Sequence, residues 1–436
     1  MSLNPNERIK IIVSIKKHVL KHHINVAGVS YDAWGKVVDE RTPTLLTADI
    51  SGFESGVQQL LSKLGSSHTV FYHGSGNEVL PQHSINATLR GVKMGDDERW
   101  MFLDVFDEGP AHVAGIKPGD LLIAVDGVSY APPSMPPFRT GQTYALTVST
   151  SRCNNTRDLR IQVPARKGTK ARPPIVEPKS LVHTMLPGNV GLLKIPYFPG
   201  AFGLRFAKTL DAAIKDLKDQ GCDRLIIDLR GNIGGSLGFA RLASYMSPGR
   251  IPIGHSLTPR RLRTGYHLGV LPRVPMPGSR ASLLFTLGRF AFRDKSVVLL
   301  TQGLGKQPFH NKIALLVNEC TNSAAEMVAS FAAENRLATV IGNKTGGHVL
   351  GAVNLKVGGG YWLRLPIFGW YTSRGESLEG KGVMPDLVVD VDPVLLNAGL
   401  DQQMEKAIEV LTTAAQVASA AAPFPKESDR YTSPSP

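Results

Sequence analysis

One serine stands where a nucleophile could be held. Ser323 follows an apolar run at 312–318, predicted as a strand, and begins an alanine-rich run at 323–334, predicted as a helix. The first N–H groups of a helix are free and lie at the positive end of its dipole, so they could stabilise an oxyanion formed beside Ser323. Serine is also a favoured helix N-cap. Taken alone, residues 320–327 (CTNSAAEM) fit both interpretations.

A second segment could supply further oxyanion donors. Residues 228–235 (DLRGNIGG) follow a predicted strand at 224–229 and form a glycine-rich loop. Its backbone N–H groups could act with the N–H of Ala324, and the candidates are Gly234 and Gly235. Glycine-rich turns without chemistry are also common in α/β proteins. A third segment, residues 379–386 (EGKGVMPD), begins with an acid, Glu379.

The three segments, in this order, resemble the C-terminal-processing (tail-specific) serine proteases and their tricorn-core relatives. The resemblance implies a ClpP/crotonase-like α/β core with Ser323 as nucleophile and an oxyanion hole at Ala324 with Gly234 or Gly235. The tail-specific branch carries a lysine 25 positions after the serine and a glutamine four residues later, but this chain has His348 and Ala352 there. A Ser-Lys dyad is therefore not available.

A serine hydroxyl needs a base at neutral pH, and three side chains compete for the role. His68 lies in residues 64–69 (LGSSHT), which resemble the segment before the PDZ domain in histidine-using members, except that Ser66 replaces the usual aspartate. His348 takes the lysine position, and Lys344 is the third candidate. In the tricorn-like branch a glutamate orients the histidine, which implies a triad of Ser323, His68 and Glu379. His348 stays open as the alternative base.

The elements that must position these residues divide the chain into five parts. We predict an N-terminal helical segment (1–78), an inserted PDZ domain (79–165), a basic proline-rich linker (166–178), the peptidase core (179–400), and a C-terminal helix with a disordered tail (401–436). The PDZ prediction depends on residues 109–127 (GPAHVAGIKPGDLLIAVDG), a short helix, turn, strand and hairpin. Such domains bind peptides by strand addition. Three acids, Asp96, Asp97 and Glu98, make capture of a peptide carboxylate doubtful.

Composition limits the partners and the compartment. The 436 residues are 42% apolar, but no run suits a membrane span and residues 1–23 lack an export signal. Three widely spaced cysteines argue against structural zinc and favour a reducing, cytoplasmic location. No cofactor is suggested, and the partner is a polypeptide substrate, with homo-oligomer formation left open.

The positive charge is concentrated in one stretch of the chain, which bears on its possible partners. The net charge is +13, and residues 250–312 hold eleven lysines and arginines against one acid, Asp294. This stretch is either a solvated insertion or a surface that attracts acidic peptides or membrane headgroups. Nucleic acid is not expected, because no nucleic-acid-binding motif accompanies the charge.

The preferred function is a serine endopeptidase that hydrolyses extended or unfolded polypeptides, with the PDZ domain binding substrate or gating the site. The alternative is a non-catalytic member of the same fold that binds a peptide or an apolar ligand, as the interphotoreceptor retinoid-binding proteins do.

Overall fold

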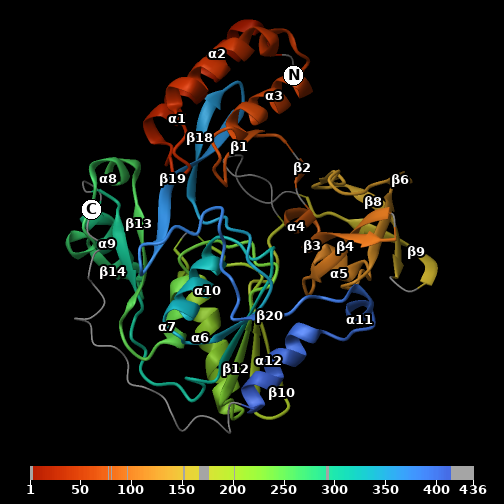
Figure 1. Ribbon diagram of the computed structural model, residues 1–436, viewed down its shortest axis with the longest axis vertical. Coiled ribbons are helices and arrows are strands. Elements are labelled where there is room, and N and C mark those ends of the chain that lie inside the picture. Colours follow the sequence, from red (N-terminus) through yellow and green to blue (C-terminus); the bar gives the residue numbers. More distant parts are fainter. Residues whose placement is uncertain are drawn as a thin grey trace.

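The structure is a computed structural model that describes residues 3–76, 78–79, 81–95, 97–150, 153–165, 176–200, 202–290 and 294–413. Three helices lie at one end of the molecule, a β-rich module lies to one side, and a layered α/β core forms the remainder (Figure 1). The prediction of a mixed α/β protein is confirmed. The predicted linker falls largely outside the described residues, and the tail falls wholly outside them.

The N-terminal segment folds as three helices, α1 (Pro5–His22), α2 (Tyr31–Thr47) and α3 (Ile50–Ser62). Their apolar faces meet over β1 (Val70–His73), β18 (Gly351–Gly358) and β19 (Tyr361–Thr372), around the buried side chains of Ile11, Trp34, Phe53 and Leu363. Strands from two ends of the chain thus share this hydrophobic core, which fixes the turn at 65–69 relative to the peptidase core.

The β-rich module has a sheet of order β3-β4-β5-β8-β9, with β6 beside β5. Its elements are α4 (Pro81–Ser84), β3 (Ala87–Met94), β4 (Asp97–Val105), α5 (Pro110–Val113), β5 (Leu121–Val125), β6 (Val128–Ser129), β8 (Thr143–Thr150) and β9 (Cys153–Gln162). The predicted hairpin at 126–127 is confirmed: both residues have positive φ, as a type I′ turn requires.

A proline-rich loop lies across part of this module. Between β6 and β8 the described chain holds β7 (Phe138–Arg139), which pairs with β2 (Glu78–Val79), and no helix. The Trp100 indole N–H donates to the Ser134 carbonyl at 2.9 Å, and a Cβ on Gly91 of β3 would lie 3.0 Å from Pro132. The loop therefore covers part of the β3–β4 surface.

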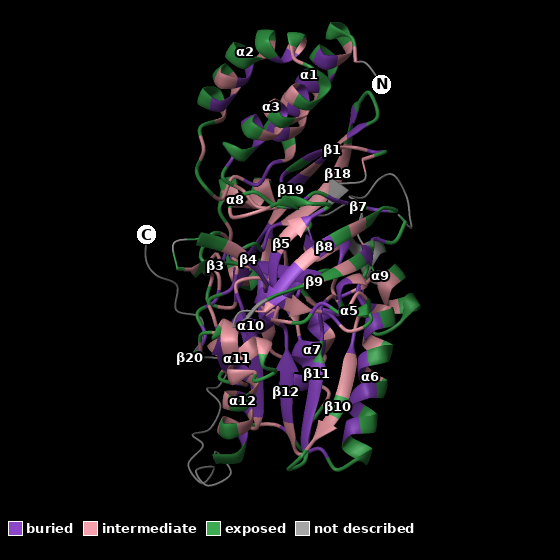
Figure 2. Ribbon diagram, turned by 90° about the vertical axis from the view of Figure 1, so that its right-hand side faces the viewer, coloured by how far each residue is buried: buried purple, intermediate pink, exposed green. Residues whose placement is uncertain are grey.

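The peptidase core is a sheet of order β10-β11-β12-β16-β17-β20, parallel from β11 onward. The strands are β10 (Val182–Leu186), β11 (Val190–Lys194), β12 (Arg224–Asp228), β16 (Ile313–Val317), β17 (Thr339–Gly342) and β20 (Leu387–Val388). Helices α6 (Leu204–Asp219), α7 (Phe239–Met246) and α10 (Ala324–Glu334) cover one face, and α12 (Gln402–Thr413) covers the other. Both faces are buried, as is typical of parallel sheets (Figure 2).

The basic stretch at 250–312 is built into a second sheet. Its elements are β13 (Pro252–Leu257), α8 (Pro259–Thr264), η1 (Leu268–Val270), β14 (Arg273–Pro275), α9 (Arg280–Phe290) and β15 (Val297–Leu300). β13 pairs with β19 as well as β15, so this stretch is part of the fold, while most of its described basic side chains are exposed to solvent. The last described elements are α11 (Pro393–Asn397) and α12. None of the described helices is long and apolar enough to cross a membrane.

Candidate active site

Ser323 lies between β16 and α10 in a strained backbone conformation. Its φ of 57° and ψ of −119° are unusual for a residue with a side chain. Strain of this kind persists only where the surroundings enforce it, and it is concentrated at functional sites. The predicted strand–serine–helix arrangement is thus present, and the strained turn distinguishes Ser323 from an ordinary helix N-cap, whose backbone is typically in the β region.

Glu326, one turn into α10, holds the Ser323 turn against residues 345–348. Its fully buried carboxylate accepts hydrogen bonds from the Ser323 N–H (3.0 Å), the Thr345 hydroxyl (2.6 Å), the Gly347 N–H (2.7 Å) and the His348 N–H (2.8 Å). Burial raises the pKa of Glu326, whereas the four donors oppose that rise. Sequence analysis assigned Glu326 no role, although an acid three residues after a helix-starting serine is a capping-box signal.

The glycine-rich loop is fixed by Asn232, a second residue without a predicted role. This fully buried amide accepts from the Gly234 N–H at 2.7 Å and donates to the Ile195 carbonyl, and the Asn232 carbonyl accepts from the Asn322 N–H at 2.8 Å. The loop is therefore bonded directly to the residue before Ser323.

The two candidate glycines differ in this geometry. Gly234 is buried and its N–H is occupied by Asn232, whereas Gly235 is exposed. Across the described residues, neither the Gly235 N–H nor the Ala324 N–H has a hydrogen-bond partner. A Cβ on Gly234 would lie 3.0 Å from the Ser323 Oγ, so the loop passes directly beside the Ser323 side chain.

His68 is connected to Glu379 through Ser67. The Ser67 Oγ lies 2.8 Å from the His68 Nδ1 and donates to the Glu379 Oε2 at 3.0 Å, while the Ser67 N–H donates to Oε1 at 2.7 Å. Because the single Ser67 hydroxyl proton goes to the carboxylate, Oγ is left to accept from an Nδ1–H of the histidine. This bridge takes the place of the direct Glu379–His68 contact that a simple triad implies. No role was predicted for Ser67 from the sequence.

The acid bonded to Ser67 and the acid bonded to Ser323 bind neighbouring positions of one loop. Glu379 also accepts from the Val349 N–H at 3.0 Å, next to the His348 N–H that binds Glu326. The described hydrogen bonds include none between His68 and Ser323. Apo catalytic contacts are often long and shorten only when substrate binds.

Burial, with a smaller contribution from the Arg364 charge, lowers the pKa of His68 to about 3. His68 is therefore neutral at physiological pH, in the protonation state that a general base requires.

The other two candidates for the base, His348 and Lys344, are exposed. His348 is bonded through its backbone to the Glu326 carboxylate, which leaves its ring at the surface.

A third group of side chains fixes the turn that carries His68, which has a φ of 61°. The buried His23, at the end of α1, lies 2.9 Å from the Ser66 Oγ through Nε2 and 2.9 Å from the Tyr31 hydroxyl through Nδ1. The Ser66 Oγ in turn lies 2.8 Å from the Thr69 Oγ1. Ser66, the departure from the family pattern, thus has a partner of its own in the N-terminal helices.

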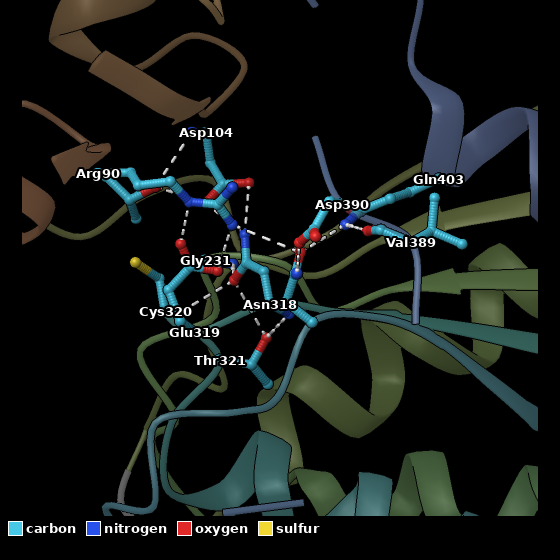
Figure 3. Close-up of polar contacts among 12 residues, drawn as sticks. Arg90, Asp104, Gly231, Asn318, Glu319, Cys320, Thr321, Val389, Asp390 and Gln403 are labelled. Atoms are coloured by element: carbon cyan, nitrogen blue, oxygen red, sulfur yellow. Dashed lines mark hydrogen bonds and ion pairs between the residues drawn. The ribbon is translucent and has the colours of Figure 1, made fainter. Parts of the chain in front are cut away.

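The β-rich module is joined to the loops of the core by partly buried polar contacts (Figure 3). Arg90 of β3 forms a bidentate ion pair with Glu319, whose second contact, Nη2 to Oε2, is 2.6 Å long. Asp104 of β4 accepts from the Asn318 amide at 2.9 and 3.1 Å. Burial raises the pKa of Asp104 to about 6. Since residues 318–323 form the loop that ends at Ser323, the module contacts the loop that holds Ser323.

Comparison with known proteins decides the family. Residues 189–389 match the sequence model of peptidase family S41. A carboxyl-terminal-processing protease of Synechocystis sp. is 23% identical over 331 residues, covering 72% of this chain and 66% of that protein. A putative tricorn protease homolog 2 of Streptomyces coelicolor is 23% identical over 403 residues, 87% of this chain and 30% of that protein.

Residues 189–389, the greater part of the peptidase core, belong to peptidase family S41. The resemblance read from the three motifs is thereby confirmed. The S41 fold is supported by the solved structure of a photosystem II D1 C-terminal processing protease, which is similar at a TM-score of 0.55 and 16% identity and covers 93% of this chain and 97% of that one. This S41 chain spans two thirds or less of the length of the curated relatives it matches.

Proposed function

We propose that this S41 chain is a serine endopeptidase that hydrolyses extended or unfolded polypeptides. The observation that carries the proposal is the Ser67 bridge, which joins His68 to the Glu379 carboxylate. Glu379 binds the loop at Val349, next to the His348 N–H that binds Glu326, the acid that holds the Ser323 turn. A histidine held in one tautomer by an acceptor at Nδ1 presents its Nε2 lone pair to a serine hydroxyl.

In the proposed reaction the Ser323 Oγ attacks the scissile carbonyl while the His68 Nε2 takes its proton. The N–H groups of Ala324 and Gly235 bind the oxyanion, because Gly234 already donates to Asn232. The imidazolium that forms is stabilised by Glu379 through Ser67, and it returns the proton to the leaving amine. Water then attacks the acyl-enzyme by the same route, with His68 again as base.

The β-rich module, the predicted PDZ domain, would act through its contacts to residues 318–320. Movement of the module would displace Asn318 and Glu319, and with them the loop that ends at Ser323. We therefore favour gating by this module over simple tethering of substrate.

Labelling with a fluorophosphonate, followed by mapping of the modified peptide, tests the proposal on the folded wild type and on Ser323→Ala, His68→Ala and His348→Ala. Labelling at Ser323 that is lost in His68→Ala and kept in His348→Ala supports it. Loss only in His348→Ala would move the base to the exposed histidine. If the folded wild type neither labels nor cleaves an unfolded polypeptide, the non-catalytic alternative, binding of a peptide or an apolar ligand, replaces it.

A further inference from the structure

Helix α1 carries an apolar stripe on its solvent side. Ile9, Val13 and Leu20 are 40%, 58% and 48% exposed, although the buried side chains of the same helix pack on α2 and β18. Spacings of four and seven residues place the three exposed side chains on one face. This helix therefore has two apolar faces, and only one of them is used by the fold.

Basic side chains flank this stripe. Lys10, Lys17 and Lys21 are exposed, and in the described part of the chain none of them forms an ion pair. The one acid of α1, Glu7, is occupied at the helix start, where it exchanges hydrogen bonds with Asn4. The exposed side of α1 is thus apolar along its middle and positive along its margin.

One arginine of the basic stretch lies near the C-terminal end of α1. Arg263, at the end of α8, lies close enough to Tyr31 for its charge to oppose the rise that burial causes in the pKa of that phenol. Tyr31 contacts His23, the residue that ends α1. Arg260 and Arg263 are exposed.

We propose that the exposed face of α1 binds an anionic lipid membrane peripherally. Exposed aliphatic side chains along one helix face, with lysines at the edge, are typical of a helix that lies in the membrane interface. In such a helix the apolar side chains enter the headgroup boundary, and the lysines contact lipid phosphates. A soluble acidic protein would satisfy the lysines but would not require three exposed aliphatic side chains between them. The inference is independent of the proposed peptidase activity.

Cosedimentation with vesicles of equal parts phosphatidylglycerol and phosphatidylcholine tests this face. Wild type should bind these vesicles at low salt, should bind much less at high salt, and should not bind phosphatidylcholine alone. The triple variant Lys10→Gln, Lys17→Gln, Lys21→Gln should lower the partition coefficient about 100-fold, at roughly fivefold per lysine. Ile9→Ser with Val13→Ser and Leu20→Ser should also abolish binding.

A matched control removes the same charge elsewhere: Lys208→Gln, Lys215→Gln and Lys218→Gln on α6 should leave binding unchanged. Equal loss in this control would reduce the effect to net charge and overturn the proposal. So would absence of binding by folded wild type, or self-association of the lipid-free protein that the Ile9, Val13 and Leu20 substitutions abolish. Insertion has its own readout: Val13→Trp should gain blue-shifted emission that brominated lipid quenches, whereas Lys208→Trp should not.

Discussion

Glu379 contacts Ser67 through both carboxylate oxygens, at 2.7 Å from the Ser67 N–H and 3.0 Å from its hydroxyl. The carboxylate thus fixes the residue before the histidine in backbone and side chain together. Glu379 positions the His68 imidazole through two consecutive hydrogen bonds, from the Ser67 hydroxyl to Glu379 and from the His68 Nδ1–H to that hydroxyl. Each bond can therefore be removed by a separate substitution.

Ser67→Ala removes the bridge and leaves His68 and Glu379 in place. We expect labelling at Ser323 to slow by about 10- to 100-fold, the range of one hydrogen bond to a charged group. Ser67→Thr keeps a hydroxyl and should restore most of the rate. The pH dependence of labelling should shift in Ser67→Ala alone; an unchanged rate and profile would remove Ser67 from the proposed relay.

Glu379→Gln should slow labelling at Ser323 more than Ser67→Ala does. Glu379 accepts three hydrogen bonds, including one from the Val349 N–H, and an amide NH₂ group placed at either oxygen position would face a donor. We expect loss of more than about 100-fold in labelling rate, together with a lower melting temperature. A rate equal to wild type would show that Glu379 is a structural loop acid.

Ser66→Ala tests the turn that carries His68. The substitution leaves the buried Nε2 of His23 without its partner, which should cost about 1–3 kcal/mol of stability. Ser66→Asp restores the residue usual in the family and keeps an acceptor beside His23, so it should retain labelling better than Ser66→Ala. The two variants are compared by labelling rate at Ser323 and by denaturant unfolding; equal labelling in both would separate this turn from the chemistry.

The Arg90–Glu319 pair should couple the β-rich module to the nucleophile. Arg90→Ala and Glu319→Ala are each expected to slow labelling at Ser323, and the double variant should be little worse than either single variant. The exposed pair Lys179–Glu108 provides a matched control, whose removal should change nothing. Additive effects in the Arg90 cycle would argue against coupling through this contact.

Stability should fall with acid between about pH 6.5 and pH 4. Burial lowers the pKa of both His23 and His255 to about 4, so the unfolded chain binds more protons than the folded chain in this window. The free energy of unfolding then decreases as pH falls, by up to about 1.4 kcal/mol per pH unit for each histidine. Asp104 has the opposite effect on the free energy of unfolding. Because its pKa is raised in the folded protein, its protonation as the pH falls stabilises the folded state.

Urea unfolding at several pH values measures this dependence. His255→Gln should flatten the slope below pH 6.5. An unfolding free energy that stays constant from pH 7 to pH 4.5 would contradict the expectation.

The sequence by itself determined the family and the strand–Ser323–helix arrangement, because local patterns of apolar residues, glycines and caps encode elements and turns. Strand and helix bounds around the site were predicted to within a residue: the strand expected at 224–229 is β12 (Arg224–Asp228), and the helix expected at 323–334 is α10 (Ala324–Glu334).

Only the tertiary structure decided which side chains meet. The Ser67 bridge joins residues 312 positions apart, and the His23–Ser66 contact joins 43. No local pattern encodes such contacts: they arise when α1, the 65–69 turn and β19 are packed into one core. The proposed choice of Gly235 over Gly234 likewise depends on the amide of Asn232, which binds the Gly234 N–H and the buried Ile195 carbonyl.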